Sequence, residues 1–268
     1  VSLSSDGTIV AIGAYYNESN GEEEVGHVRV YEYIGTVWTQ LGQDIDGEAA
    51  DDRSGRSVSL SSDGTIVAIG ARDNDGNGDK AGHVRVYQYS GTIWNQLGQD
   101  IDGEAEDDWS GETISLSSDG TIVAIGARYN QGINGFESGH VRVYQYDGTV
   151  WVQLGQDIDG EAAEDRFGYG LSLSSDGTIV AIGAYRNDGI NGVDSGHVRV
   201  YQYKGTAWTQ LGLDIDGEAA DDWLGYGSTS VSLSSDGNIL ATGARYNDGP
   251  DGTNNGHVRV FGLSPNLA

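Results

Sequence analysis

The sequence predicts an all-β protein of the β-propeller class, with five blades of four-stranded antiparallel sheet. The segment SLSSDGTIVAIGA occurs unchanged four times and the variant SLSSDGNILATGA once, so the chain repeats at intervals of 56 to 60 residues. Each copy leads to GHVRVY or GHVRVF, and four copies add a Trp-x-Gln-Leu-Gly segment. A short antiparallel unit repeated at a fixed period is typical of a propeller blade.

Four short strands are expected in each repeat. In the second repeat the first strand, around Val58 and Leu60, alternates apolar and polar residues, which indicates one buried face. The second strand, 66–71, is apolar throughout, as expected of a strand buried on both faces. The third, 83–89, is rich in β-branched and aromatic residues, and the fourth begins at Trp94. Ser-Asp-Gly joins the first two strands as a tight hairpin.

The chain is expected to form a single domain, residues 1–268. Its repeats cover approximately 1–57, 58–113, 114–170, 171–230 and 231–268. The fifth repeat ends after its third strand, so the last blade is expected to lack its outer strand in this chain. An unpaired strand edge is a template for another chain, and either a further segment or a neighbouring subunit would fill it.

The composition excludes several classes of function. With 14 basic and 41 acidic residues the formal net charge is −27, which argues against nucleic acid or an anionic membrane surface as a partner. No apolar run is long enough to span a bilayer, so membrane insertion is not expected. The chain has no cysteine, so neither disulfides nor thiolate metal sites hold the fold.

The repeats resemble the FG-GAP repeats of integrin-α-type propellers. The clearest copy is Asp165-Arg166-Phe167-Gly168-Tyr169-Gly170, which leads through two strands to Gly183-Ala184. Phe167-Gly168 stands at the family's Phe-Gly position, and Gly183-Ala184 stands at its Gly-Ala-Pro position without the proline. The resemblance spans nearly the whole chain and implies an extracellular or cell-surface protein that serves adhesion or assembly.

The resemblance does not carry over the family's usual calcium site. Calcium-binding repeats of the integrin type have an Asp-rich loop between the first and second strands. Here that loop is only Ser-Ser-Asp-Gly, which is too short to surround an ion.

Two other segments make Ca²⁺ a candidate cofactor. The acidic turn that begins Asp-Ile-Asp-Gly-Glu-Ala occurs four times, and its first copy offers Asp44, Asp46, Asp51 and Asp52. Clustered carboxylates can supply several of the roughly six to eight oxygens that calcium takes. The alternative is that one Asp caps the turn, another pairs with the repeated Arg and the rest are solvated.

The second candidate metal segment is the loop with Asp73, Asp75, Asn77 and Asp79. Its oxygen-bearing side chains stand at alternate positions, as in a calcium loop. The loop lacks a closing Glu, and the other repeats do not reproduce the pattern. A flexible polar loop without an ion is the alternative interpretation.

Candidate ligand-binding residues come from the third strand and from the turn before the first. Each of the five histidines stands two residues before an Arg, as in His83–Arg85 and His140–Arg142. Alternation places both side chains of a pair on one face of the strand. Such pairs either line repeated pockets between blades or form ion pairs with the acidic turns. Trp109 and Trp223 replace an Arg of the other repeats and are candidates for exposed contacts.

The sequence contains no catalytic constellation, and we expect the protein not to be an enzyme. The favoured function is a structural or adhesion propeller that acts through protein partners or self-assembly, with or without calcium. The alternative is a multivalent lectin with one glycan-binding pocket per blade interface. Asn17 begins an N-glycosylation sequon, which agrees with an extracellular location.

Overall fold

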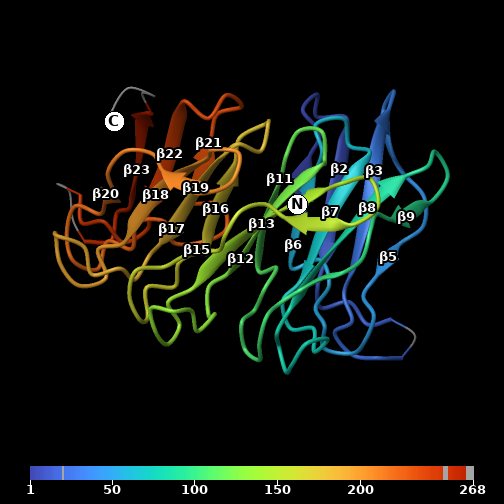
Figure 1. Cartoon of the computed structure of the whole chain (residues 1–268). Helices are drawn as coiled ribbons and strands as arrows, with labels where there is room; N and C mark the ends of the chain where they lie inside the picture. Colours follow the sequence, from blue (N-terminus) through green and yellow to red (C-terminus); the bar gives the residue numbers. More distant parts are fainter. Residues whose placement is uncertain (20, 250–252, 264–268) are drawn as a thin grey trace. The chain divides into compact units, whose positions relative to one another are not determined.

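The computed structural model describes residues 1–19, 21–249 and 253–263, and within these ranges it contains strands and no helix (Figure 1). The strands form five separate sheets, one for each sequence repeat. We call these sheets blades 1 to 5. The prediction of an all-β fold built from five antiparallel blades is confirmed.

The strand bounds repeat closely from blade to blade. Blade 1 contains β1 (Ser2–Leu3), β2 (Ile9–Ala14), β3 (His27–Ile34), β4 (Val37–Gln40) and β5 (Ile45–Asp46). Blade 2 contains β6 (Ser57–Leu60), β7 (Ile66–Ala71), β8 (His83–Tyr89), β9 (Trp94–Gln96) and β10 (Ile101–Asp102). Blade 3 contains β11 (Thr113–Leu116), β12 (Ile122–Ala127), β13 (His140–Tyr146), β14 (Trp151–Gln153) and β15 (Ile158–Asp159). Blade 4 contains β16 (Gly170–Leu173), β17 (Ile179–Ala184), β18 (His197–Tyr203), β19 (Trp208–Gln210) and β20 (Ile215–Asp216). Blade 5 contains β21 (Val231–Leu233), β22 (Ile239–Ala244) and β23 (His257–Gly262).

Each of the first four blades has one strand more than expected. In blade 1 the order is β1-β2-β3-β4, and the two-residue strand β5 pairs with β3 through Val28 opposite Ile45. A strand of two residues has no measurable periodicity, so the sequence pattern did not indicate it. Blade 5 has three strands among the described residues, and residues 264–268 lie outside them.

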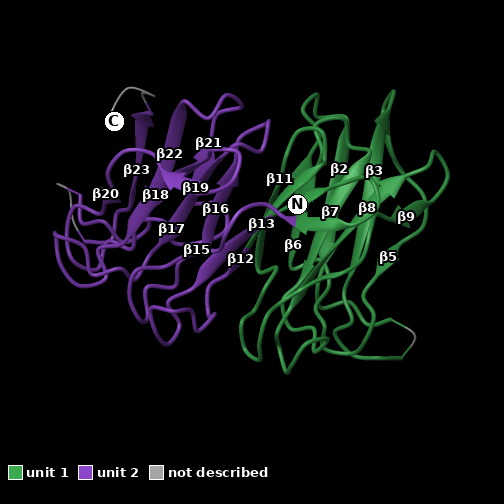
Figure 2. Cartoon of the chain, viewed as in Figure 1, with its two compact units in different colours: residues 1–125, 144–152 green, residues 126–143, 153–268 purple. Residues whose placement is uncertain are grey.

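The chain divides into two compact units (Figure 2). Unit 1 comprises residues 1–125 and 144–152, and unit 2 comprises residues 126–143 and 153–268. The expectation of a single domain stays a prediction.

The Ser-Asp-Gly hairpins are closed by their aspartates. In blade 2, Asp63 accepts hydrogen bonds from the Ser61 hydroxyl and from both the backbone N–H and the hydroxyl of Thr65. Gly64 has a φ of +72°, a conformation that glycine adopts without strain. The same side-chain bonds recur in the first, third and fourth hairpins, which explains why the segment Ser-Ser-Asp-Gly is the same in every repeat.

Two glycines of the FG-GAP pattern allow successive blades to approach closely. Gly55, in the turn before β6, donates its N–H to the Gly70 carbonyl at 3.1 Å. A Cβ added to Gly13 of blade 1 would lie 2.0 Å from the Gly55 oxygen. The equivalent contact joins Gly70 to Gly111, also at 2.0 Å. Any side chain at these strand positions would therefore separate the blades.

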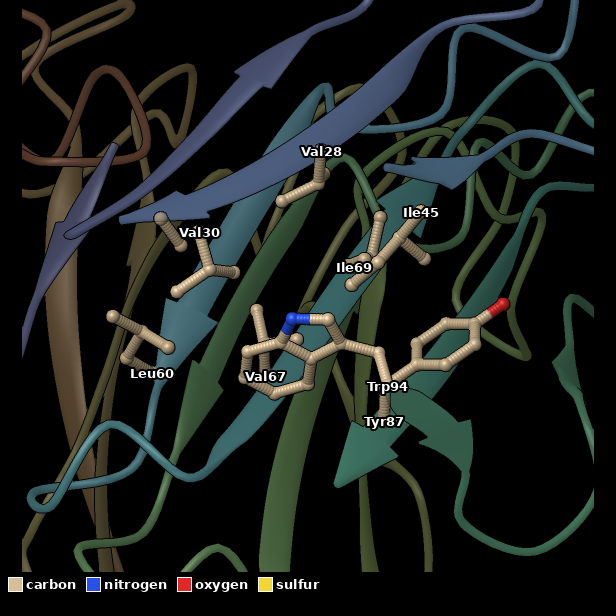
Figure 3. Close-up of a cluster of buried hydrophobic side chains, with 9 residues drawn as sticks. Val28, Val30, Ile45, Leu60, Val67, Ile69, Tyr87 and Trp94 are labelled. Carbon is tan, nitrogen blue, oxygen red and sulfur yellow. The ribbon is translucent and has the colours of Figure 1, made fainter. Parts of the chain in front are cut away.

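Tryptophan fills the core between blades. Trp94 of blade 2 packs among Val28 and Val30 of blade 1 and Val67 of its own blade (Figure 3). Its Nε1 donates a hydrogen bond to the Leu41 carbonyl of blade 1 at 2.8 Å. Gln43 of blade 1 bonds both the N–H and the carbonyl of Trp94. The same three contacts recur at Trp151 in unit 1 and at Trp208 in unit 2.

The first blade provides a natural control for this contact. Trp38 occupies the equivalent position in blade 1 but is 47% exposed, whereas Trp94 is 3% exposed. We expect Trp94→Ala to lower the free energy of unfolding by about 3–5 kcal/mol, as for other buried aromatics. Trp38→Ala should lower the free energy of unfolding by about 1 kcal/mol or less. Urea unfolding followed by far-ultraviolet circular dichroism measures both, and equal losses would contradict the assignment of Trp94 to the inter-blade core.

Candidate functional site

The His–Arg pairs lie beside carboxylates of the neighbouring blade. In unit 1, Arg85 pairs with Glu48 of the preceding acidic turn at 3.1 Å and donates to the Asp46 carbonyl. One ligand atom each from Glu48, His83 and Asp100 lie within 4.8 Å of one another. His83 is buried, while Glu48 is exposed at the rim.

The same arrangement occurs in unit 2. Arg199 pairs with Glu161 of the preceding acidic turn and with Asp214 of its own blade, the latter at 2.8 Å. The hydrogen bond from Arg199 lowers the pKa of the Asp214 carboxyl. Glu161, His197 and Asp214 again bring one ligand atom each within 4.8 Å.

Each of these groups contains atoms that could bind a metal ion, but also an arginine guanidinium that competes for the same carboxylates. Burial, assisted by the neighbouring guanidinium, lowers the pKa of His83 and of His197 to about 4, so both imidazoles are neutral at physiological pH. A neutral imidazole and two carboxylates suit Zn²⁺ better than Ca²⁺, which prefers oxygen ligands. However, the Arg of each group already pairs with one or both carboxylates. The arrangement therefore acts first as an ion-pair network between blades.

The remaining predicted ligand-binding residues lie in two different places. His140 and Arg142 are buried on β13. Trp109 and Trp223 are half-buried in the turns before β11 and β21, and both have positive φ values. The Arg72 guanidinium lies 4.3 Å from the centre of a Trp109 ring.

The acidic turn does not gather its carboxylates around one point. Asp44 pairs with Arg29 of its own blade at 2.7 Å. Asp52 is buried and accepts the backbone N–H groups of Glu48 and Ala49. It also accepts a hydrogen bond from the Asn74 amide of blade 2 at 3.2 Å, so it links one blade to the next.

The other two carboxylates of this turn have different surroundings. Asp46 lies on β5, exposed, and Asp51 is exposed with a φ of +64°. The four predicted ligands thus serve an ion pair, a turn cap and the solvent-facing rim.

The loop of residues 73–79 is also organised by internal bonds. Asp73 is buried and pairs with both Arg53 and Arg72, at 3.3 and 3.1 Å. Asp75 accepts the Lys80 N–H, and Asn77 donates its amide to the Gly103 and Glu104 carbonyls. Asp79 is exposed. The amide nitrogen of Asn77 therefore ties this loop to the backbone of the following acidic turn.

Aromatic and arginine side chains gather at one end of the strands in unit 2. Tyr185, at the end of β17, is 2% exposed and contacts Tyr169, Trp223 and Tyr226 at ring-centre distances of 5.6, 5.4 and 4.8 Å. Its hydroxyl accepts a hydrogen bond from Arg166 at 3.1 Å. These positions are among the few at which the repeats differ.

Sequence reasoning expected an Asp of the acidic turn to pair with the repeated arginine, but across the blade boundary the partners are Glu48 and Glu161. A glutamate occupies this position in every copy of the acidic turn, so its regular spacing was available as a signal. Sequence reasoning also missed Arg186, which replaces Asp73 of the second repeat.

Asn17, the predicted glycosylation site, lies half-buried after β2, where its carbonyl accepts the Gly26 N–H.

Comparison of this fold with solved structures gives the class of protein. TolB from Acinetobacter baumannii matches 97% of this chain with a TM-score of 0.51 and 13% identity, over 51% of its own length. A protein assigned as TolB from Agrobacterium tumefaciens matches 98% of this chain with a TM-score of 0.52 and 12% identity, over 76% of its length. A protein assigned as a 6-phosphogluconolactonase from Bacteroides uniformis matches 98% with a TM-score of 0.50 and 12% identity, over 84% of its length. This chain spans about half the length of the Acinetobacter TolB.

The likeness at such low identity concerns the fold alone, and it places the chain among β-propeller proteins. The search of curated proteins found no match. A family model of the FG-GAP repeat matches residues 45–87 and 158–201. The resemblance to FG-GAP repeats inferred from Phe167-Gly168 and its neighbours is confirmed by these two matches. In the described part of the chain, no helix has the length and hydropathy of a membrane span.

The buried histidines should make the protein sensitive to mild acid. An unfolded histidine has a pKa near 6.5, and the folded values of His83, His140 and His197 are about 4. The unfolded chain therefore binds protons first, and stability should fall as the pH drops from about 6.5 to about 4. His197→Gln should reduce the slope of the unfolding free energy against pH by up to about 1.4 kcal/mol per pH unit. Urea titrations across this range measure the slope, and an NMR titration of His197 near pH 6.5 would contradict the argument.

Proposed function

We propose that this protein is a non-enzymatic structural or adhesion module of the extracellular space or cell surface, and that it acts through protein–protein contacts. FG-GAP propellers of the integrin type are mostly extracellular, which supports the location. The repeated Arg, Asp, Asn and Gln side chains described above bind one another across blades, which leaves few of them available for catalysis. We therefore assign the contacts with other molecules to surfaces that do not pack against a neighbouring blade.

One observation carries this proposal. Val198 and Val200 of β18 are 0% and 2% exposed because blade 5 packs against them. Val258 and Val260 occupy the same positions of β23 and are 71% and 67% exposed. Blade 5 thus presents an uncovered apolar face whose equivalents elsewhere receive the next blade. Uncovered apolar faces of this kind are typical of interaction surfaces.

Blade 1 presents the complementary side of the same contact. Leu60 and Trp94 of blade 2 are 7% and 3% exposed because they pack on blade 1. Their counterparts in blade 1, Leu3 and Trp38, are 58% and 47% exposed. A blade of this repeat therefore fits both uncovered faces.

The partner that these faces fit best is a second copy of this chain. The residues exposed on blade 5 and on blade 1 are the same residues that pack together between blades 1 and 2. Such a head-to-tail contact is heterologous, so it leads either to a closed ring of copies or to an open chain of them. The net charge of −27 opposes association at low ionic strength.

We expect the protein to self-associate with a salt dependence that reflects this charge. Light scattering during size-exclusion chromatography should give a larger mass at higher protein concentration, and more so at about 0.5 M salt, where the Debye length is only a few ångströms. The double variant Val258→Asp/Val260→Asp should remain a monomer. Ile190→Asp changes a residue that is 89% exposed but lies in a loop, and it should associate like the wild type. A wild-type chain that stays near 28.3 kDa under all these conditions would rule out self-assembly.

We expect this function not to require calcium. Asp44 and Asp73 are held by guanidinium groups, and Asp52 is held by backbone N–H groups and Asn74. A ligand that binds only the folded state raises its stability, by about 2.7 kcal/mol at a hundred times its dissociation constant. We expect the melting temperature in millimolar Ca²⁺ to equal that in chelator. A higher melting temperature in Ca²⁺ than in chelator would show that one of these carboxylate groups binds the ion.

A further inference from the structure

A polar pocket of about 310 Å³ opens in unit 2 between the acidic turn of blade 3 and the loop that follows β17 of blade 4. The turn contributes Glu164 and Asp165, and the loop contributes Arg186, Asn187, Asp188 and Asp194. Its volume is in the range of small-molecule sites. The pocket is separate from the uncovered blade faces, so this inference is independent of the proposed self-assembly.

At the equivalent place in unit 1 the turn and the loop are joined by an ion pair. There Arg53 of the turn pairs with Asp73 of the loop at 3.3 Å. In unit 2 the turn residue is again an arginine, Arg166, but the loop residue is Arg186. Two arginines cannot form an ion pair, so the loop residue gives Arg166 no counterpart of the Arg53–Asp73 pair. Arg166 pairs with Glu137 at 2.7 Å, just as Arg53 also pairs with Glu24 at 2.7 Å.

The backbone around the pocket is nevertheless the same as in unit 1. Asn187 donates to Asp165 at 3.0 Å, as Asn74 donates to Asp52 at 3.2 Å. The substitution of one loop residue between repeats therefore leaves the two walls in place and removes the ion pair that would join them.

Arg186 is left with unused hydrogen-bonding capacity. Its Nε is buried and has no hydrogen-bond partner, and no carboxylate among the described residues lies within ion-pair distance of it. The guanidinium lies 5.9 Å from the ring centres of both Tyr185 and Trp223. The residue is half-buried and lines the pocket, so a ligand acceptor there would meet a guanidinium that has no carboxylate partner.

Both walls of the pocket offer acceptors. Burial raises the pKa of the Asp194 carboxyl, and the charges of Asp188 and Asp221 raise it further against the opposing effect of Arg186. Glu164 and Asp188 are exposed at the mouth of the pocket. One small pocket thus combines a guanidinium donor with several carboxylate acceptors.

This combination selects the class of ligand. A free anion would be repelled by Glu164, Asp188 and Asp194, and a metal ion would be repelled by Arg186. A hydroxyl group can accept a hydrogen bond from Arg186 and donate one to a carboxylate, and it carries no charge. We propose that this pocket binds a monosaccharide unit of a glycan through its hydroxyl groups.

The proposal places one sugar site in unit 2 at a position where the repeats differ. It assigns no sugar to the His–Arg pairs, because the Arg85 and Arg199 guanidiniums are already paired with Glu48 and Glu161. The equivalent place between blades 4 and 5 also has a pocket, of about 430 Å³, lined by residues that include Glu218, Asn247 and Asp248. The proposed sugar site differs from it through Arg186, which the other repeats do not share.

The test is an NMR titration of the ¹⁵N-labelled full chain with D-mannose, D-galactose, L-fucose and N-acetyl-D-glucosamine. At least one sugar should shift the amide signals of Asn187 and Asp194 saturably, with a dissociation constant on the order of 1 mM. Arg186→Ala should weaken binding about tenfold or more through loss of the charged donor. Arg186→Asp should abolish binding and keep the melting temperature, because it gives Arg166 the acidic partner that Arg53 has in Asp73.

Arg245→Ala is the matched control, since Arg245 belongs to the same group of aromatic and arginine side chains but does not line this pocket. It should bind the sugar like the wild type. The proposal is overturned if none of the four sugars shifts these signals at tens of millimolar, or if Arg186→Asp binds as well as the wild type. Saturable shifts with sodium phosphate or CaCl₂ in place of a sugar would overturn it as well, by assigning the pocket to an ion.

Discussion

The close approach of glycine backbones between blades is the constraint on which the rest of this structure depends. A Cβ on Gly13 or Gly70 would lie 2.0 Å from a carbonyl oxygen of the next blade. Because these glycines allow contact, the valines of the third strand meet the next blade and Trp94 reaches the Leu41 carbonyl of the preceding one. A single blade of three to five strands buries little apolar surface by itself, and most of its stability comes from its neighbours. The Phe-Gly and Gly-Ala pairs of the repeat are thus the two sides of one packing contact.

The polar residues of the repeat serve the same contact. Asp52 holds its own turn and also Asn74 of the next blade, while Gln43 holds the backbone of Trp94. The Asp52–Asn74 bond joins two buried side chains, so removing one partner would leave the other unsatisfied. This requirement explains why the same polar residues recur in the acidic turns. The carboxylates that are not needed for packing remain at the rim, where they keep copies apart at low salt.

Function in such a protein belongs to the places where the repeat is interrupted or altered. The uncovered valines of blade 5 and the exposed Trp38 of blade 1 are repeat residues that lack their usual neighbour. Arg186 is the opposite case, because its neighbours are present but its residue type has changed. We propose that the first kind of difference provides a surface for another blade, and that the second provides a site for a small ligand. Both arise from small departures within a repeated scaffold, which needs no new fold to acquire a binding site.

The sequence by itself determined the class of fold, the number of blades and the order of their main strands. Period, alternation and turn residues are local properties, and Ser61, Asp63 and Gly64 form their hairpin with one another. The tertiary structure alone decided which partners the polar residues take, because Glu48 reaches Arg85 and Asn74 reaches Asp52 across a blade boundary. No pattern within one repeat indicates such a pairing. It also decided that the calcium-like spacing of Asp73 to Asp79 is used for ion pairs and backbone bonds, since Arg53 arrives from the preceding turn. The pocket beside Arg186 depends on the same contact between repeats, so only the assembled blades reveal it.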